Sequence, residues 1–493
     1  MTQRSLTCDK PKCFCGVFGI YGIDNASVYT YYGLLALQHR GQEAAGIATI
    51  QDVEGKKHLS IHRDFGLVAD VFSDASILKD KLTGKVAIGH NRYSTTGASG
   101  SEKNIQPLYM HYKNGNLAIG HNGNLTNAAI LREKLINEGS IFQTSSDTEV
   151  ILHLIARSRG NDLIAQIKDA LNQIEGAFCL VILTDDKLIA ARDKNGFRPL
   201  CLGKLNGSYI VTSETCALDI NSAEYVRDIE PGELVIIDSD GVKSEKFSPE
   251  TGAPVENTHC VFEYIYFSRP DSRIFGSNVD KIRRKLGKVL AQNHPVVDKD
   301  GEKVIVISVP DSSNTVAIGY QSQLEKQNIA SKLEIGLIRS HYIGRTFILP
   351  DQKNREIGVK IKFNPVKGVL ENKTVVLIDD SIVRGTTSKQ LIKLIKEANP
   401  NEIHLRISSP PILNPCYYGM DFPSKKELIA NKFGNDIEEI RKYLEVDSLH
   451  YLTIDEMLSA MIDHKPSEFC TACFSGNYPV KIYDNFNKLK YDN

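Results

Sequence analysis

The sequence predicts a chain of two domains, the second of which is an α/β domain with a mainly parallel sheet and helices on both faces. One observation is an aliphatic run at 375–378 that ends in two carboxylates and precedes a helical pattern from Ser388 onward. Another is that similar runs at 304–309 and 335–338 alternate with helical segments. The third is length, because 493 residues with 41% hydrophobic side chains can form two or more cores.

Charge and composition narrow the class of function. The formal net charge is -1, and Lys and Arg are scattered, so the sequence has no basic region for nucleic acid or an anionic membrane. No stretch has the length and apolar character of a signal peptide or a membrane span. We therefore expect a cytoplasmic protein with no nucleic acid partner and no membrane partner. Ten cysteines in such a chain indicate reduced thiols, metal ligands or catalysis in preference to disulfides.

The first candidate for chemistry is Cys15, which ends a polar leader (1–14) and opens an apolar strand pattern at 15–22. If the leader is removed, the α-amine of Cys15, with an ordinary pKa of about 7.7–8.0, can act as the base that activates the thiol. One alternative is a tail followed by a structural cysteine. Another is a small metal site that uses Cys8, Cys13 and Cys15.

Three short motifs follow that could serve the same site. Arg92 comes after a strand pattern and could hold a carboxylate through two hydrogen bonds. The Asn122 side chain and the Gly123 N–H could form an oxyanion hole, although an Asn-Gly pair alone usually marks a hairpin. Asp147 could pair with an α-ammonium group, although 146–149 also matches a helix capping box.

In order, these motifs resemble the N-terminal nucleophile (Ntn) glutaminase domain of the amidotransferases. The resemblance implies an α+β Ntn-hydrolase sandwich (αββα), in which Cys15 attacks the glutamine amide. It also implies that Arg92 holds the α-carboxylate, that Asp147 holds the α-amine, and that Asn122 with Gly123 stabilises the oxyanion. The resemblance covers roughly 15–242 and includes the stretches His39–Glu43, Arg192–Asp193, Gly196–Pro199 and Thr212–Thr215.

The second domain carries its chemistry at the end of the strand 375–378. Asp379 and Asp380 lie in the crevice where open α/β sheets bind ligands, and could accept hydrogen bonds from sugar hydroxyls or hold Mg²⁺. The turn that follows offers N–H groups, hydroxyls and a helix N-terminus to an anion. Its residues are Arg384, Gly385, Thr386, Thr387 and Ser388. An acidic N-cap on an ordinary loop is the alternative. The segment closely resembles the phosphoribosyl pyrophosphate (PRPP) motif of type I phosphoribosyltransferases, which implies that the acids face the ribose and the loop cradles the 5′-phosphate.

Two other strand ends belong to the same expected site. The resemblance implies that Ser312, after the strand 304–309, joins Asp379 and Asp380 around Mg²⁺. It implies that Arg345 lies in a loop that closes over PRPP. Ser340-His341 departs from the Asn-Arg that relatives often carry before this loop. The polar stretch 244–258 marks the junction, which divides the chain into a leader (1–14), a glutaminase domain (15–250) and a phosphoribosyltransferase domain (251–493) with C-terminal helices.

Four cysteines of the second half remain. Cys260, Cys416, Cys470 and Cys473 could hold zinc or a [4Fe–4S] cluster, which their spacing does not distinguish. The pair Cys470–Cys473 could instead be a redox pair. The whole chain resembles the leader-peptide and iron–sulfur branch of the glutamine PRPP amidotransferase family, and this implies a [4Fe–4S] cluster on these four residues. Other cysteines are expected in cores, namely Cys179, Cys201 and Cys216.

Further elements are expected near the cluster. The run 260–267 has strand character. Two later helices, one with Ile437, Ile440 and Leu444 and one that starts at the capping box Thr453–Glu456, are expected to pack against the cysteines.

The family resemblance implies a coupled reaction. Cys15 would form a glutamyl thioester and release ammonia, which would cross a shielded passage and displace pyrophosphate from C1 of PRPP. The product would be 5-phosphoribosylamine, the entry to purine synthesis. Feedback inhibition by purine nucleotides and a homotetramer are implied as well. The alternatives are another Ntn amidotransferase, making an amino sugar or asparagine, and a PRPP-sensing regulator that binds RNA, which the near-neutral charge disfavours.

Overall fold

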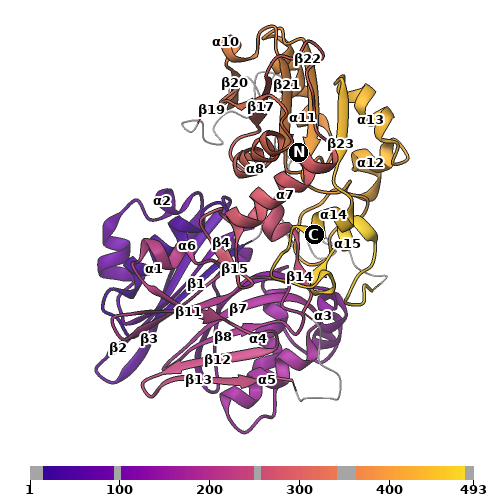
Figure 1. Ribbon diagram of the computed structural model, residues 1–493. Coiled ribbons are helices and arrows are strands. Elements are labelled where there is room, and N and C mark those ends of the chain that lie inside the picture. Colours follow the sequence, from indigo (N-terminus) through magenta and orange to yellow (C-terminus); the bar gives the residue numbers. More distant parts are fainter. Residues whose placement is uncertain (1–14, 94–100, 249–256, 341–361, 484–493) are drawn as a thin grey trace.

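The computed structural model describes residues 15–93, 101–248, 257–340 and 362–483. Within these ranges the chain forms a first domain of two packed antiparallel sheets and a second domain around a parallel sheet (Figure 1). No helix in these ranges is long and apolar enough to cross a membrane.

The first domain contains two extended sheets. The strand order of the seven-stranded sheet is β11 (Glu224–Asp228), β9 (Cys201–Leu205), β10 (Ser208–Thr212), β1 (Gly16–Tyr21), β4 (Val86–Arg92), β2 (Ala44–Val53) and β3 (Lys56–Phe65). The order of the six-stranded sheet is β13 (Gly241–Lys246), β12 (Glu233–Asp238), β8 (Leu188–Arg192), β7 (Gly176–Thr184), β6 (Gly115–Leu125) and β5 (Leu108–Tyr112).

Helices cover the outer face of each sheet. The helices on the seven-stranded sheet are α1 (Ala26–Ala36), α2 (Val68–Val71) and α6 (Cys216–Ile220), and those on the six-stranded sheet are α3 (Ala128–Asn137), α4 (Thr148–Arg157) and α5 (Leu163–Gln173). A further core, between the sheets, includes Val17 and Val181. The predicted αββα sandwich is therefore confirmed.

Alternation along β1 explains why this strand lies at the centre. Phe18 and Ile20 pack under α1, whereas Val17 points into the core between the sheets. Gly19 allows the close approach that the small residues of this strand predict, because a Cβ there would lie 2.9 Å from Leu188 Cδ1 of the facing sheet.

The second domain has a five-stranded sheet in which all neighbouring strands are parallel, as predicted. Its order is β18 (Ser331–Leu333), β17 (Val304–Ser308), β21 (Thr374–Asp379), β22 (Glu402–Ile407) and β23 (Ser448–Tyr451). Alternate residues of β21 enter two cores, one with α7 (Val279–Asn293) and α8 (Asn314–Lys326), the other with α11 (Thr386–Lys396) and α13 (Ile437–Leu444). The smaller helices are α10 (Lys367–Leu370), α12 (Ile429–Lys432), α14 (Ile454–Ser459) and α15 (Ala472–Ser475).

One expected strand is largely absent, and another lies outside the main sheet. Of the run 260–267, only Cys260 belongs to a strand, β14 (His259–Cys260), and Glu263–Phe267 forms a π-helical turn whose side chains are nearly all buried. Aromatic and β-branched residues suit a strand, but here burial on every side favours a helical turn. The run 335–338 stays outside the main sheet. Its residues Leu337–Arg339 form β19, which pairs only with β20 (Phe363–Pro365), and Ile335 is 72% exposed.

Two helix predictions need correction as well. Helix α11 begins at Thr386, two residues before the predicted start. Helix α13 packs in the core of the parallel sheet, with Ile440 and Leu444, and not against the cysteines. Helix α14 does share a core with them through Met457, and the predicted capping box of Thr453 and Glu456 is present.

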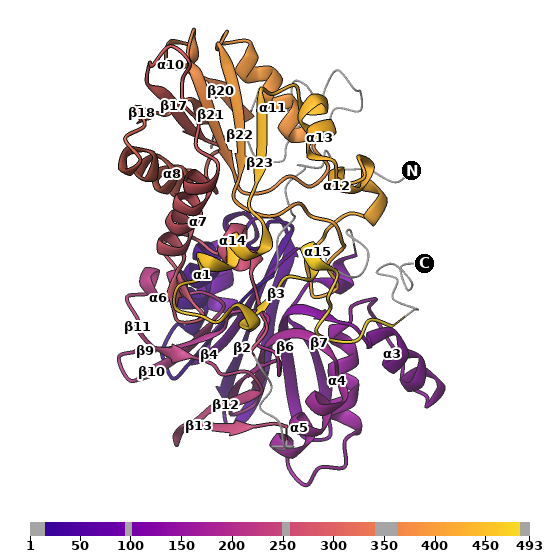
Figure 2. The ribbon, with the colours of Figure 1, turned by 45° about the vertical axis from the view of Figure 1, so that its right-hand side comes forward.

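The end of the chain returns to the first domain. Figures 1 and 2 show the yellow C-terminal segment descending beside α15 toward the two sheets, while the parallel sheet lies on the far side of α7. Strand β24 (Phe469–Cys470) pairs in parallel with β14, which sets Cys470 opposite Cys260. The start of the second domain and the end of the chain are thus held together where the domains meet.

Candidate active sites and cysteine cluster

Cys15, Arg92, Gly123 and Asp147 line one narrow cavity in the first domain. Cys15 directly precedes β1, and Arg92 is the last residue of the neighbouring strand β4. Gly123 lies on β6 of the other sheet, and Asp147 precedes α4. Four residues that the sequence analysis assigned to one site are therefore brought together from both sheets.

The thiol at this cavity is held in its neutral form. Burial raises the pKa of Cys15 to about 11, while a backbone hydrogen bond at Tyr93 and the positive charge of Arg92 oppose this rise. The Cys15 thiol lies 3.6 Å from the Tyr93 carbonyl oxygen. Since the thiolate is the nucleophilic form, a base is needed at the site for the thiol to react near neutral pH.

The Asn122-Gly123 pair does not form a hairpin. Both residues lie inside β6, where Asn122 pairs with Cys179 and Gly123 with Phe178 of β7. The Asn122 side chain is fully buried, and neither atom of its amide has a hydrogen-bond partner in the described part of the protein. A buried amide without partners is costly, and such groups occur where a ligand supplies the missing bond.

The capping box predicted as the alternative role of 146–149 is not formed. Helix α4 starts at Thr148, but the Asp147 side chain makes no capping bond. Asp147 instead accepts a hydrogen bond from the Leu125 N–H (3.0 Å), which ties it to the end of β6. Glu149 accepts from the N–H groups of Gln143 (2.7 Å) and Thr144 (2.8 Å).

Sequence reasoning missed several residues of this cavity. Those that line it without having been assigned are Tyr93, Asn104, Gln106, His121 and Ser146. Gln106 accepts from the His121 N–H (2.7 Å), and Thr148 Oγ1 lies 3.1 Å from His121 Nδ1, so these side chains fix the register of β6. The signal for His121 was its place directly before Asn122.

The two acids expected at the second site lie at the carboxyl end of the parallel sheet. Asp379 ends β21, and Asp380 follows it fully buried. Ser312 Oγ donates to Asp380 Oδ2 (2.5 Å), and Ser313 Oγ donates to Asp379 Oδ1 (3.3 Å). Ser312 therefore contacts Asp380, whereas the neighbouring Ser313 contacts Asp379. The charge of Asp380 also reaches Arg283, where burial lowers the pKa to about 10 and Asp380 acts against that shift.

The expected phosphate loop lies between β21 and α11. Gly385 has a left-handed φ of 78°, and α11 begins directly after it, so Thr386, Thr387 and Ser388 form the first helical turn. The N–H groups of such a turn have no partner within the helix and suit an anion. Arg384 pairs with Glu427 (Nε–Oε1 3.5 Å) at the rim. Arg345, Cys8 and Cys13 lie outside the described residues.

The four cysteines implied as cluster ligands come together from three segments. Cys260 and Cys470 are opposite one another in β14 and β24, and Cys473 lies in α15. The carbonyl of Cys473 accepts the N–H of Leu413, which ties α15 to the segment that carries Cys416. Cys416 Sγ accepts the Tyr418 N–H (3.3 Å).

Burial and neighbouring thiols together affect the pKa of Cys473. Burial raises the pKa of Cys473 well above its ordinary value, and Cys470, Cys260 and Cys416 raise it further. Burial likewise raises the pKa of Cys260 to about 11. No group of three His, Cys, Asp or Glu side chains in the described ranges is arranged to hold a single metal ion. All eight cysteines in those ranges are free, and Cys179, Cys201 and Cys216 are buried, as predicted.

Comparison with known proteins agrees with this geometry. Residues 90–219 match a family model described as a glutamine amidotransferase domain. The chain is 49% identical to amidophosphoribosyltransferase 2, chloroplastic, of Arabidopsis thaliana, over 96% of this chain and 80% of that protein. It is 48% identical to amidophosphoribosyltransferase of Bacillus subtilis, over 96% and 95%. A solved structure of glutamine PRPP amidotransferase from B. subtilis, complexed with ADP and GMP, has a TM-score of 0.86 at 46% identity and covers 96% of this chain and 98% of that one. The chain belongs to the amidophosphoribosyltransferase family.

Proposed function

We propose that this chain makes 5-phosphoribosylamine from glutamine and PRPP, the first step of purine synthesis, with two sites that work in sequence. The observation that carries the proposal is the cavity that Cys15 shares with Arg92, Gly123 and Asp147. The carboxylate pair at the end of β21 supports the second half of the reaction.

In the first site, removal of the leader (1–14) frees the α-amine of Cys15. The amine takes the thiol proton, and the thiolate attacks the amide carbon of glutamine. The Asn122 amide and the Gly123 N–H donate to the oxyanion. Arg92 binds the α-carboxylate and Asp147 the α-amine of the substrate. As the tetrahedral intermediate collapses, the α-ammonium group returns its proton to the leaving nitrogen. Ammonia departs and a glutamyl thioester remains, which water hydrolyses to glutamate.

In the second site, Asp379, Asp380 and Ser312 are the residues that would hold Mg²⁺, since hard cations prefer oxygen ligands. The ion would neutralise charge on the leaving pyrophosphate. The acids also face the ribose hydroxyls. Ammonia attacks C1 of PRPP, and the C1–O bond to pyrophosphate breaks. A passage that shields ammonia from water keeps it unprotonated between the two sites.

The first turn of α11 would bind the 5′-phosphate of PRPP. N–H groups and hydroxyls of this turn would receive the phosphate, and the arginines would add positive charge. The residues concerned are Arg384, Gly385, Thr386, Thr387 and Ser388, together with Arg345 outside the described residues.

We propose a [4Fe–4S] cluster on Cys260, Cys416, Cys470 and Cys473. The donor set fits, because β14 and β24 set Cys260 opposite Cys470, Cys473 follows in α15, and such clusters accept all-cysteine ligation. The cluster would join segments distant in the sequence and so stabilise the contact between the domains.

Regulation and assembly follow the family. Purine nucleotides are proposed as feedback inhibitors, which the ADP and GMP complex of the B. subtilis relative supports. We also propose a homotetramer in the cytoplasm, without nucleic acid or membrane partners, in keeping with a formal net charge of -1.

The test replaces the nucleophile. Cys15→Ala should lower glutamine-dependent product formation at least about 10³-fold, because no other group at the cavity can form the thioester. The same variant should keep its rate with ammonium salts at high pH. Cys201→Ala, at a buried cysteine of β9, is the control and should retain both activities. Glutamine use by Cys15→Ala at the wild-type rate would refute the mechanism.

A further inference from the structure

A group of four fully buried charges lies where the two domains meet. Arg40, Arg198 and Glu214 come from the first domain, and Glu263 comes from the π-helical turn that follows β14. Two positive and two negative side chains balance, as buried charges must if they are to stay ionised. Burial opposes the charged form of Arg40, but Glu263 and Glu214 raise its pKa above the ordinary value. Arg40 therefore carries its charge at every pH at which the protein is folded.

Arg40 links this group to the nucleophile. Its Nε donates to the carbonyl oxygen of Cys15 (3.3 Å). Its two terminal nitrogens donate to Glu263, from Nη2 to Oε1 (2.7 Å) and from Nη1 to Oε2 (3.1 Å), and Nη1 also bonds to Glu214. A two-point arginine–carboxylate pair fixes the plane of the guanidinium group. The direction of the Nε–H toward Cys15 is thus set by Glu263.

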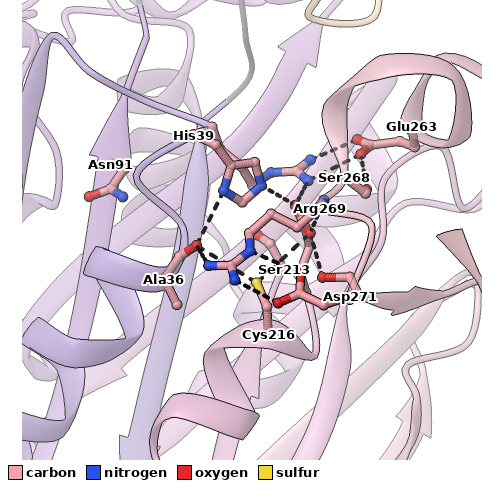
Figure 3. A network of polar contacts seen from close by, with 12 residues as sticks. Ala36, His39, Asn91, Ser213, Cys216, Glu263, Ser268, Arg269 and Asp271 are labelled. Carbon is pink, nitrogen blue, oxygen red and sulfur yellow. Dashed lines mark hydrogen bonds and ion pairs between the residues drawn. The ribbon is translucent and has the colours of Figure 1, made fainter. Parts of the chain in front are cut away.

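The carboxylate of Glu263 is itself held firmly. Ser268 Oγ donates to its Oε2 (2.8 Å), and Arg198 Nη1 lies 3.4 Å from its Oε1. Arg283 of α7 fixes the turn by donating to the carbonyls of Tyr264 (2.7 Å) and Ser268 (2.9 Å). Figure 3 shows Glu263 beside Ser268, with His39 and Arg269 in the same network of polar contacts.

The carbonyl that Arg40 holds belongs to the residue that reacts. Fixing this oxygen fixes the peptide plane between Cys15 and Gly16, and hence the position of the Cys15 Cα, from which the thiol and the α-amine extend. A small misplacement of a nucleophile lowers the rate of the chemical step more than the affinity for substrate.

We propose that Glu263, a residue of the second domain, is a positioning residue for glutamine hydrolysis in the first domain, acting through Arg40 on the Cys15 carbonyl. The inference rests on the proposed role of Cys15 as nucleophile. It assigns the second domain a direct part in the glutaminase half-reaction, through a side chain that contacts neither substrate.

Glu263→Gln tests the proposal, because the amide keeps the shape but loses the charge and one of the two acceptors. We expect the kcat for glutamine hydrolysis to fall at least tenfold, with the KM for glutamine changed less than threefold. The ammonium-dependent reaction with PRPP should stay within twofold of wild type. Glu263→Asp keeps the charge and should recover part of the lost kcat.

A matched control is Glu233→Gln. Glu233 is also a buried carboxylate in an ion pair, with Arg227 (2.6 Å), and lies outside the group around Arg40. The Glu233→Gln substitution should lower the thermal unfolding midpoint without changing the kcat for glutamine hydrolysis. If Glu263→Gln is poorly soluble, Ser268→Ala removes one hydrogen bond to Glu263 Oε2 and should give a twofold to fivefold loss of the same kcat.

Three results would overturn the inference: a wild-type glutamine kcat in Glu263→Gln, an equal loss of glutamine-dependent and ammonium-dependent activity, or the same kcat loss in Glu233→Gln. Cys15→Ala is measured alongside. If that variant still uses glutamine, the proposed function fails. If it behaves as expected while Glu263→Gln matches wild type, only the positioning role fails.

Discussion

Gly385 offers a sharp test of the expected phosphate loop. Its φ of 78° is left-handed, and a Cβ at this position would overlap the Cδ1 atom of Ile429 on α12. Gly385→Ala therefore meets two separate penalties. The backbone conformation costs a non-glycine residue roughly 1–2 kcal/mol. Inserting a methyl group into a packed site costs about 1–3 kcal/mol more.

The sum, about 2–5 kcal/mol, can be divided experimentally. Gly434 also has a left-handed φ, of 59°, but a Cβ there would have open space around it. Gly434→Ala should thus show the backbone penalty alone. Ile429→Val removes the Cδ1 atom that a Cβ at position 385 would overlap. The double variant Gly385→Ala/Ile429→Val should therefore regain the stability lost to overpacking, less the roughly 0.5–1.5 kcal/mol that Ile→Val costs by itself.

Two assays report the outcome. Thermal unfolding should rank Gly385→Ala below Gly434→Ala. In the ammonium-dependent reaction, which bypasses Cys15, the KM for PRPP should rise at least tenfold in Gly385→Ala, because the displaced turn moves the N–H groups that receive the phosphate. It should stay near wild type in Gly434→Ala. Equal stabilities together with an unchanged KM would refute the reasoning about this loop.

The remaining predictions concern the cluster and acid stability. Anaerobically purified protein should have the intact mass of a chain that starts at Cys15 and should carry a brown, broadly absorbing chromophore. Cys473→Ser should lose the iron, the colour and several degrees of thermal stability. A colourless, iron-free wild-type protein as stable as Cys473→Ser or more so would contradict the cluster. Burial lowers the pKa of His90 from 6.5 to about 3, so only the unfolded chain gains this proton between pH 6.5 and 5. The free energy of unfolding should therefore decrease by about 2 kcal/mol as the pH is lowered over this interval. His90→Gln should remove that share of the loss in chemical unfolding followed at both pH values, and an unchanged slope would contradict it.

The hydrophobic pattern of a short segment predicted its structure correctly where every residue of the segment has similar surroundings. The run 375–378 is apolar at every position because its strand is covered on both faces, and it lies where the pattern predicts. The same logic failed for 260–267, where a helical turn is also buried on all sides and composition does not separate the two. Glu263 was the one indication in that run that it is not an ordinary core strand. A carboxylate among aromatic residues needs a buried cation.

The candidate site shows the other limit of sequence reasoning. Asn122-Gly123 looks like a turn because both residues favour turns, and pairing with Cys179 and Phe178 of β7 keeps it extended. The contact between Arg40 and Glu263 joins residues 223 positions apart. No spacing rule reaches that far, so the sequence indicated Arg40 only as part of a motif and gave no partner for it.

The contact of the segment near Cys416 with the first domain has a consequence for synthesis of the chain. The segment near Cys416 contacts the first domain directly, because Asn124 Nδ2, close to the oxyanion residues, donates to the Tyr417 carbonyl (2.8 Å). On the ribosome, about 170 residues separate the end of β13 from this segment, a delay of roughly 10–35 s at about 5–20 residues per second. Through this interval the first domain is complete in sequence but lacks the contact beside its oxyanion residues. A nascent chain thus lacks this contact between the domains until most of the second domain has been made.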